Sequence, residues 1–388
     1  MKNPSRKINW LVISILVVIV VAISAPMYYY RIMNATDSDY SNHILYTYKL
    51  LAREPWPVLN EVHPLLQILL GGMSWISRSR IDPFAGMIIF LVACQVVMSL
   101  LLFSWFGQLA MRGWDWIKAL VAISLIVIAP VFALVPFDNR YYFGYIGLAD
   151  YRNPNMPLLR VLSFISFYFA VNIFKKSRNP VWMLAVSAFV TILSALAKPN
   201  YLLCILPTIF LVGIIWTIRK QEWDWRLFLF GFLVPGIAIL LVQWLLSYGA
   251  GISTTILIYP FAIKYFSKYI FLKFLLSILF PLVATSLLFK KMVRDPYILL
   301  SWIGFAAGAV MFYFFAESGS RLYALNFQWG AEVMLFLLIA SIVRFCLKTF
   351  TEEKAVLWKH LLIWGVYLLY VGFGILYYIH CITGSSYA

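Results

Sequence analysis

The sequence predicts an all-α polytopic membrane protein with a single transmembrane domain over residues 1–388. Hydrophobic residues make up 63% of the chain and charged residues only 12%. The mean hydropathy is +0.87, so the apolar side chains are too numerous for the core of a water-soluble protein. Apolar runs of about twenty residues, the length that crosses the hydrocarbon layer as an α-helix, recur along the chain.

About eleven segments combine this length with an apolar composition. Transmembrane helices are expected at residues 9–29, 84–105, 117–136, 159–175, 180–197, 201–218, 226–247, 270–289, 296–316, 328–347 and 356–380. The first of them follows a basic N-terminal stretch and could pass for a signal peptide, but its length favours a retained helix.

The distribution of Lys and Arg predicts the orientation of these spans. With the N-terminus in the cytoplasm, each inner connection is short and basic, as the positive-inside rule requires. These connections contain Arg112 and Lys118; Lys175, Lys176 and Arg178; Arg219, Lys220 and Arg226; Lys290, Lys291 and Arg294; and Arg344, Lys348 and Lys354. The C-terminus is then extracytoplasmic. Because neither soluble domains nor paired cysteines are evident, the sequence favours a bacterial inner membrane.

The first outer segment, residues 30–83, is long and is predicted to contain two helices that lie along the membrane surface. The first, at about 42–54, has an apolar stripe that includes Tyr48, with Lys49 opposite, as expected of an interfacial helix. The second, at about 62–77, holds roughly fourteen apolar residues and is too short to cross. If it crossed, every later basic loop would face outward.

Asp37 and Asp39 directly follow the first span and are the candidate catalytic residues. In the predicted orientation both carboxylates lie at the outer membrane face. A hydroxyl group is a poor nucleophile, and a positioned carboxylate that accepts its proton accelerates its attack by roughly 10²–10⁴-fold. The alternative is that both are ordinary solvated loop acids.

The later outer segments carry further polar side chains. They are Asp138, Arg140, Asp150, Lys198, Glu317 and Arg321. A guanidinium or ammonium stabilises the charge that gathers on a departing phosphate most where water is scarce. Alternatives remain open for the cations, since Lys198 at a helix hairpin can snorkel to the interface. Arg321 has two possible acidic partners, Glu317 one helical turn away and Glu332 near the end of an apolar span.

Four features, in their order along the chain, resemble the GT-C superfamily of integral-membrane glycosyltransferases. They are the acidic pair after the first helix, a surface helix that opens with His63 and Pro64, the Lys198 and Pro199 hairpin, and the late outer Arg321. The resemblance covers the architecture of roughly residues 1–250, and residues 251–388 correspond to variable C-terminal helices.

The resemblance implies a GT-C-like fold and a transferase that moves a sugar from a polyprenyl-phosphate or polyprenyl-pyrophosphate donor to an extracytoplasmic acceptor, usually with inversion. The expected partners are this donor, a glycan or lipid-linked acceptor and membrane lipids, without nucleic acid. In that family an acid of the first outer loop activates the acceptor hydroxyl, the role expected of Asp37 or Asp39, and basic side chains hold the donor phosphate. Substrate contacts are expected from His63, Arg140, Asp150, Lys198, Arg321 and Glu317.

The sequence does not decide whether the protein binds a divalent metal ion, Mg²⁺ or Mn²⁺. Two or three acids with an open coordination shell can hold such an ion beside a phosphate. The candidate ligands are Asp37 and Asp39, with Asp138 or Asp150. Some members of the superfamily work without a metal.

Three other functions remain as alternatives. A polymerase or ligase of surface polysaccharide uses similar donors but adds whole repeat units. A transporter or flippase of a lipid-linked sugar places polar groups near the bilayer midplane, whereas the predicted spans here are almost wholly apolar. A non-enzymatic scaffold would leave the charged outer loops without a task.

Overall fold

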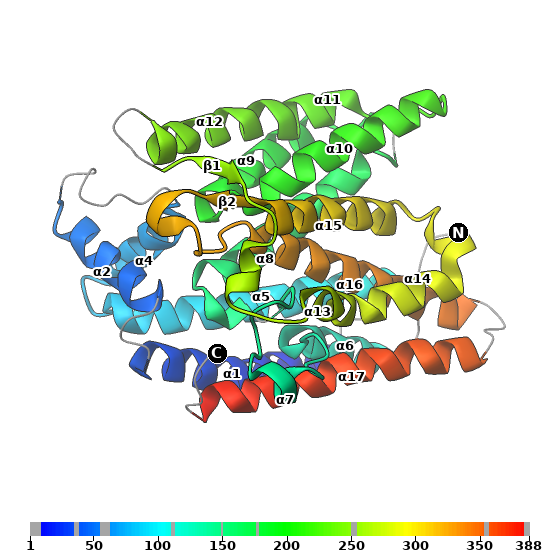
Figure 1. The fold of residues 1–388 in the computed structure, drawn as a ribbon, viewed down its shortest axis with the longest axis horizontal. Coiled ribbons are helices and arrows are strands. Elements are labelled where there is room, and N and C mark those ends of the chain that lie inside the picture. Colours follow the sequence, from blue (N-terminus) through cyan, green and yellow to red (C-terminus); the bar gives the residue numbers. More distant parts are fainter. Residues whose placement is uncertain are drawn as a thin grey trace.

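The computed structural model describes residues 9–34, 39–54, 63–109, 113–148, 150–175, 178–249, 254–352 and 357–383. They form a bundle of helices that run side by side (Figure 1). Within these residues, seven helices are long and apolar enough to cross a membrane. They are α1 (Trp10–Asn34), α5 (Pro83–Gly107), α10 (Asn200–Ile218), α11 (Trp225–Phe228) continued through a π-turn (Leu229–Leu233) into α12 (Val234–Tyr248), α15 (Pro296–Phe314), α16 (Gln328–Glu352) and α17 (Leu357–Ile382). The protein is therefore a polytopic helical membrane protein.

Shorter or bent helices occupy the other predicted spans. α13 (Ile270–Ser277) and α14 (Leu279–Met292) together are long and apolar enough for one span, but they are bent by 57°. α8 (Asn155–Asn172) and α9 (Val181–Ala197) coincide with two further predicted spans. The expected number of about eleven crossings therefore stays a prediction beyond the seven long helices.

The span predicted at 117–136 is not one continuous helix. α6 (Asp115–Val127) ends after 13 residues, and the short α7 (Val135–Asp138) follows only after an irregular stretch. The backbone is already extended at Ile128, with φ −60° and ψ 140°. Pro130 explains the break, because proline lacks the N–H that a helix needs and disfavours helical geometry at the residue before it.

α17 packs closely against this break. The Ala129 N–H donates to the Tyr370 carbonyl at 3.2 Å. A Cβ added to Gly374 would lie only 1.9 Å from the Val127 carbonyl oxygen. The close approach of the two backbones therefore requires glycine at this position of α17.

Helices occur at both places predicted for surface-lying elements. α2 (Asp39–Leu51) and α4 (Leu65–Ile76) contact each other and lie together at one end of the bundle, here called the α2–α4 end (Figure 1, left). With 12 residues, α4 is about 18 Å long, well short of the hydrocarbon thickness of about 30 Å. Its Trp75 and Ile76 are more than three-quarters exposed, as suits residues in contact with lipid headgroups.

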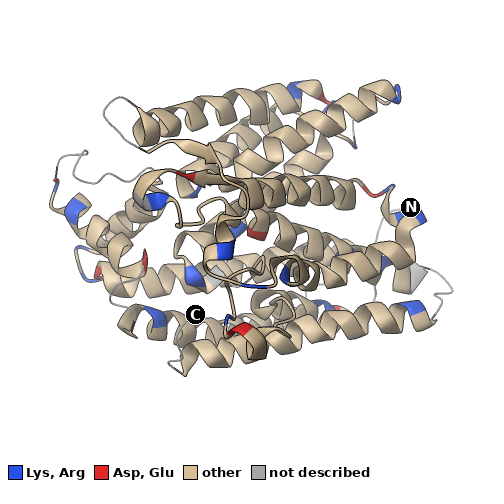
Figure 2. Cartoon of the chain, in the orientation of Figure 1, with Lys and Arg blue, Asp and Glu red and all other residues tan. Residues whose placement is uncertain are grey.

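Two short strands join α12 to α15 in space. β1 (Ile256–Ile258) pairs with β2 (Phe315–Glu317) in an antiparallel register that places Ile256 opposite Glu317. The 3-10 helices η3 (Ala262–Tyr265) and η4 (Gly319–Arg321) follow the two strands, and η1 (Asp150–Arg152) precedes α8. The C-terminal end of α17 lies at the α2–α4 end, whereas α14 and α16 end, and α15 and α17 begin, at the opposite end (Figure 1). Lys and Arg occur at both ends of the bundle (Figure 2). Which end faces the cytoplasm stays a prediction.

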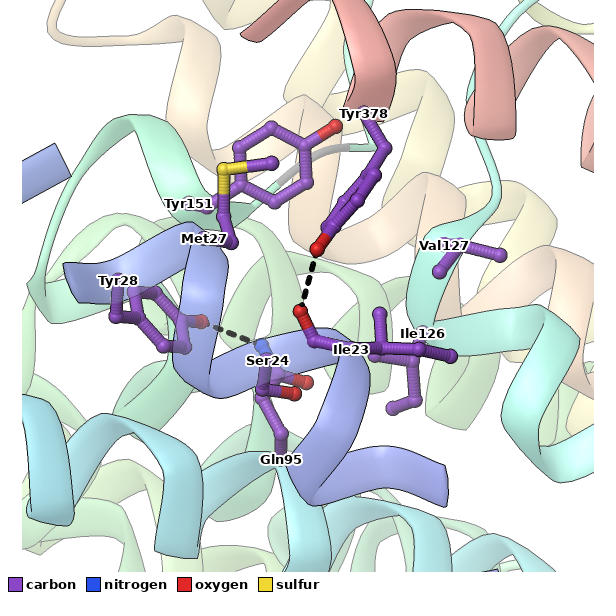
Figure 3. A pocket seen from close by; sticks show the side chains of 9 residues that line it. All are labelled: Ile23, Ser24, Met27, Tyr28, Gln95, Ile126, Val127, Tyr151 and Tyr378. Carbon is purple, nitrogen blue, oxygen red and sulfur yellow. Dashed lines mark hydrogen bonds between the residues drawn. The ribbon is translucent and has the colours of Figure 1, made fainter. Parts of the chain in front are cut away.

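α16 is the central helix of the bundle, since 83% of its apolar window is buried. Near α1, a small cavity of about 10 Å³ is lined by Ser24, Tyr28 and Gln95 (Figure 3). The Gln95 amide donates to the Tyr28 hydroxyl at 2.6 Å, and the Tyr378 hydroxyl donates to the Ile23 carbonyl at 2.8 Å (Figure 3). This space fits about one water molecule and is too small for a larger ligand.

Candidate functional site

A cavity of about 530 Å³ lies at the α2–α4 end. It is lined by Tyr46, His63, Lys198, Pro199, Asn200, Leu203, Ile237, Leu240, Leu241, Gln243, Trp244, Ser247, Tyr248, Ile256, Glu317, Arg321, Asn326 and Phe327. Four of the predicted substrate-binding residues, His63, Lys198, Glu317 and Arg321, therefore share one cavity. Its volume is within the range of about 300–1,000 Å³ that is usual for small-molecule sites.

α12 supplies an apolar wall to this cavity. Ile237, Leu241 and Trp244 line it, and each side chain is about half exposed. They recur at intervals of four and three residues, so they form one stripe along the helix. This wall is suited to an extended hydrocarbon chain.

Lys198 places a cation at the junction of α9 and α10. Pro199 follows it, which disfavours helical geometry at Lys198, and Lys198 is extended with φ −170° and ψ 130°. Its ammonium lies 4.9 Å from the centre of the Trp329 ring, and the side chain is only 7% exposed. Its ammonium adds positive charge to the cavity wall, where charges are screened less than in bulk water.

Arg321 supplies a second cation from η4. Its guanidinium lies 3.8 Å from the Glu317 carboxylate, and 47% of its side chain is exposed, against 6% for Glu317. Glu317 also accepts hydrogen bonds from the Tyr248 hydroxyl at 2.5 Å and from the Asn326 amide. Glu317 is thus held by two hydrogen-bond donors, while Arg321, at 3.8 Å, is only ion-paired with it and lines the cavity with a half-exposed side chain.

A buried histidine lies behind the Lys198 side of the cavity. Burial, and secondarily the charge of Lys198, lower the pKa of His43 to about 3. The imidazole is therefore neutral at physiological pH. It is hydrogen-bonded on both nitrogens, at 3.2 Å from the Asn155 amide nitrogen to Nε2 and at 2.6 Å from Nδ1 to the Gln67 amide group.

Gln67 connects this histidine to the start of α4. In the amide orientation that satisfies all partners, its oxygen accepts from His43 Nδ1, and its nitrogen lies 3.3 Å from the carbonyl oxygens of His63 and Pro64. His43 then carries its proton on Nδ1 and accepts from Asn155 at Nε2. This network fixes the backbone from which His63 reaches the cavity.

Asp39 is not part of the cavity wall. It is exposed at the start of α2, and its carboxylate accepts a hydrogen bond from the Asn153 amide at 2.6 Å. Asn153 in turn accepts from the backbone N–H of Asn155, a partner of His43. Asp37 lies outside the described residues. The catalytic role of this acidic pair stays a prediction.

Arg140 and Asp138 belong to a different cluster. The Asp138 carboxylate accepts from Lys273 Nζ at 2.5 Å, and both side chains are almost fully buried. The same ammonium donates to Ser267 Oγ at 2.8 Å and to the Phe143 carbonyl at 2.9 Å. Neither Arg140 nor Asp138 lines the cavity, and the side chain of Asp150 is outside the described part of the chain.

Glu332 does not pair with Arg321. It accepts hydrogen bonds from the Tyr142 hydroxyl and, at 2.7 Å, from the Gln328 amide. The Arg152 guanidinium lies 3.6 Å from the centre of the Tyr142 ring. Glu332 is thus tied into the core between α16 and the loop that precedes α8.

The acids of the described residues do not form an evident metal site. No three His, Cys, Asp or Glu side chains of this part of the chain converge as metal ligands do. Asp138, one of the candidate ligands, is bound by Lys273 instead. A Mg²⁺ or Mn²⁺ site that includes Asp37 stays a prediction.

The sequence did not single out Tyr248, Gln243 or His43 as parts of the site. Tyr248 and Gln243 lie in an apolar span, where a polar side chain is expensive unless it has a partner; this was the available signal. The Gln243 amide donates to the Ala195 carbonyl at 2.8 Å. His43 was recognisable only as a histidine inside an interfacial helix.

Comparison with protein-family models, with curated protein sequences and with solved structures found no match to this chain. The chemistry of the site must therefore be inferred from its own residues.

Proposed function

We propose that the protein is a membrane glycosyltransferase of the GT-C kind that takes a sugar from a polyprenyl-phosphate or polyprenyl-pyrophosphate donor. The observation that carries this proposal is the composition of the 530 Å³ cavity. One wall is an apolar stripe of α12, and Lys198 and Arg321 stand among the other lining residues. These two features are complementary to a lipid with an anionic head group, because the apolar stripe suits its hydrocarbon chain and the cations suit its phosphate.

The donor phosphate fits the two cations. Lys198 and Arg321 come from connections more than a hundred residues apart in the sequence, yet both line the cavity. Charge-assisted hydrogen bonds from an ammonium and a guanidinium are about twice as strong as neutral ones. The polyprenyl chain then lies along Ile237, Leu241 and Trp244.

The amides of the cavity suit the sugar. Asn200, Gln243 and Asn326 line it, and Asn200 and Asn326 are held together by a hydrogen bond of 2.7 Å from the Asn200 amide to the Asn326 carbonyl. Amide groups both donate and accept, as hydroxyl groups of a sugar require.

The acceptor is activated by an acid of the first outer segment, Asp37 or Asp39. Its carboxylate accepts the acceptor's hydroxyl proton, the hydroxyl oxygen bonds to the anomeric carbon, and the bond from that carbon to the phosphate oxygen breaks. The released polyprenyl phosphate carries the electron pair and is stabilised by Lys198 and Arg321. Attack opposite the leaving group inverts the anomeric carbon. The active face is extracytoplasmic and the N-terminus cytoplasmic, as the basic loops predict.

Binding of decaprenyl phosphate to the purified protein in zwitterionic nanodiscs tests the lipid-phosphate site. We expect Lys198→Gln and Arg321→Gln each to weaken binding by about tenfold or more, because each removes a charge-assisted contact. Arg80→Gln, at an exposed site outside the cavity, is the matched control. Equal affinity in all variants would show that Lys198 and Arg321 do not bind the lipid phosphate.

Glycan analysis of a strain that lacks the gene tests the reaction. The wild-type chain should restore the missing sugar, whereas Asp37→Asn or Asp39→Asn should not, although each variant inserts into the membrane in normal amounts. Full restoration by both single variants and by the double variant contradicts the catalytic assignment.

A further inference from the structure

Exposed tyrosines gather beside the cavity, on the segment that follows β1 and on the turn after η4. They are Tyr259, Tyr265, Tyr269 and Tyr323, and are here called the tyrosine platform. Tyr265 is the most exposed, at 68%. Tyrosine offers both an apolar ring face and a hydrogen-bonding hydroxyl, so a group of exposed tyrosines indicates a binding surface.

The rings of the platform are held in place. Tyr265 and Tyr323 are stacked at 4.3 Å with an angle of 21° between their planes. Phe266 packs edge-on against both stacked rings and is itself stacked on Phe143 at 4.9 Å. The platform therefore presents a fixed ring face.

The backbone of this segment is strained. Phe261 and Tyr269 have φ of 61° and 55°, in the left-handed region that bulky residues rarely adopt. The Phe261 N–H donates to the Tyr313 carbonyl at 2.7 Å, and the Tyr269 carbonyl accepts from the N–H of Lys273 at 2.9 Å. Such strain persists where the surroundings hold it, and it is concentrated at binding and catalytic sites.

The platform is basic. Lys264 and Lys268 are exposed, and residues 254–269 contain no Asp or Glu. The nearby carboxylates are already engaged: Asp138 accepts from Ser267 and is paired with Lys273, and Glu317 is paired with Arg321. Lys264 and Lys268 therefore attract an anionic ligand, and the paired carboxylates nearby repel it little.

The platform is continuous with the cavity. Ile256 of β1 and Arg321 of η4 line the cavity, and Tyr259 and Tyr323 follow them by three and two residues. Ile256 is also opposite Glu317 in the two-stranded pairing. A chain bound across the tyrosines can thus extend its end into the cavity.

We infer that the tyrosine platform binds an acidic carbohydrate, an oligosaccharide that carries carboxylates, as the acceptor of the proposed transfer. Its pyranose rings stack on Tyr265, its hydroxyls bond to the tyrosine hydroxyls, and its carboxylates meet Lys264 and Lys268. The acceptor role rests on the proposed function, but the binding itself does not.

Equilibrium binding of tetragalacturonate, with maltotetraose as the neutral counterpart, tests this inference on the full chain in zwitterionic nanodiscs. Saturable binding of the uronate, stronger than that of the neutral sugar and weakened by salt, is expected. Tyr265→Ala should weaken it by about tenfold, because a stacked ring is lost, whereas Tyr265→Phe should retain most of it. The double variant Lys264→Gln, Lys268→Gln should abolish the preference for the uronate.

Tyr29→Ala, on the exposed face of α1, is the control for an aromatic side chain that only contacts lipid. If Tyr29→Ala and Tyr265→Ala have equal effects, the platform is an aromatic belt at the membrane interface and the inference is wrong. Absent uronate binding, or equal binding of both sugars, also overturns it. Decaprenyl phosphate binding by Tyr265→Ala separates the two proposals, since it reports the cavity alone.

Discussion

Two ion pairs of this protein differ in what surrounds them. Lys273 and Asp138 are 2.5 Å apart and buried, and the ammonium has further partners in Ser267 and the Phe143 carbonyl. Arg321 and Glu317 are 3.8 Å apart, and the arginine is half exposed on the cavity wall. The first pair is closed to any ligand, whereas in the second only the acid is enclosed.

This difference indicates a structural role for Lys273 and a ligand-binding role for Arg321. Lys273 is enclosed by groups that neutralise and satisfy it, so it joins α13 to the loop after α7. Arg321 keeps its donors available, because Tyr248 and Asn326 hold Glu317 in place of the arginine. A charge that a fold leaves open beside a cavity is available for a ligand.

Among substitutions in these two ion pairs, the largest expected effect is on the free energy of unfolding. Lys273→Met leaves the Asp138 carboxylate buried without its partner, which should cost about 3–5 kcal/mol. Arg321→Met breaks a partly exposed pair and should cost no more than about 1 kcal/mol. Thermal unfolding of both variants in the same detergent measures the difference.

The double variant Asp138→Asn, Lys273→Met is the control for this comparison. Because it removes both charges, it should recover much of the lost stability. If Lys273→Met and Arg321→Met lower the melting temperature equally, the distinction between a closed and an open pair fails.

Long apolar runs predicted most of the helices, because their length and composition depend on the lipid solvent alone. The exception at 117–136 is local, since Pro130 ends regular helix inside an apolar run. The composition could not distinguish a broken apolar segment from a continuous one, because the irregular stretch is buried against α17 and needs no polar residues at its surface.

The site could be predicted only in part. The sequence indicated His63, Lys198, Glu317 and Arg321 because charged or polar side chains in the predicted outer loops have few structural roles. Asp138 and Lys273, by contrast, are 135 residues apart, and Tyr142 and Glu332 are 190 apart. No local pattern marks such pairs, so the sequence could not show that Asp138 and Arg140 lie away from the cavity.

A smaller effect concerns pH and the network behind Lys198. The folded-state pKa of His43 is about 3, below the ordinary value of about 6.5. The stability that this shift contributes is fully present above about pH 6.5 and is lost as the pH falls towards 3. Between pH 7.5 and pH 5 the loss should be about 2 kcal/mol.

Chemical unfolding of the wild type and of His43→Gln at these two pH values measures this contribution. The variant keeps a polar side chain but has no group that titrates in this range, so its stability should depend less on pH. The same pH dependence in both proteins would show that His43 is not the group responsible.

The smallest expected effect is on ligand affinity, and it follows from a substitution in the partly exposed pair of Arg321 and Glu317. Glu317→Gln removes the negative charge beside Arg321 while an amide oxygen still accepts from the Tyr248 hydroxyl or the Asn326 amide. Arg321 then faces the cavity without a counter-charge, so decaprenyl phosphate should bind severalfold more tightly, while stability changes by about 1 kcal/mol at most. If instead Glu317 orients Arg321 for the phosphate, the same variant binds more weakly. Tighter binding by Glu317→Gln therefore identifies Arg321 as an open cation whose affinity the acid restrains.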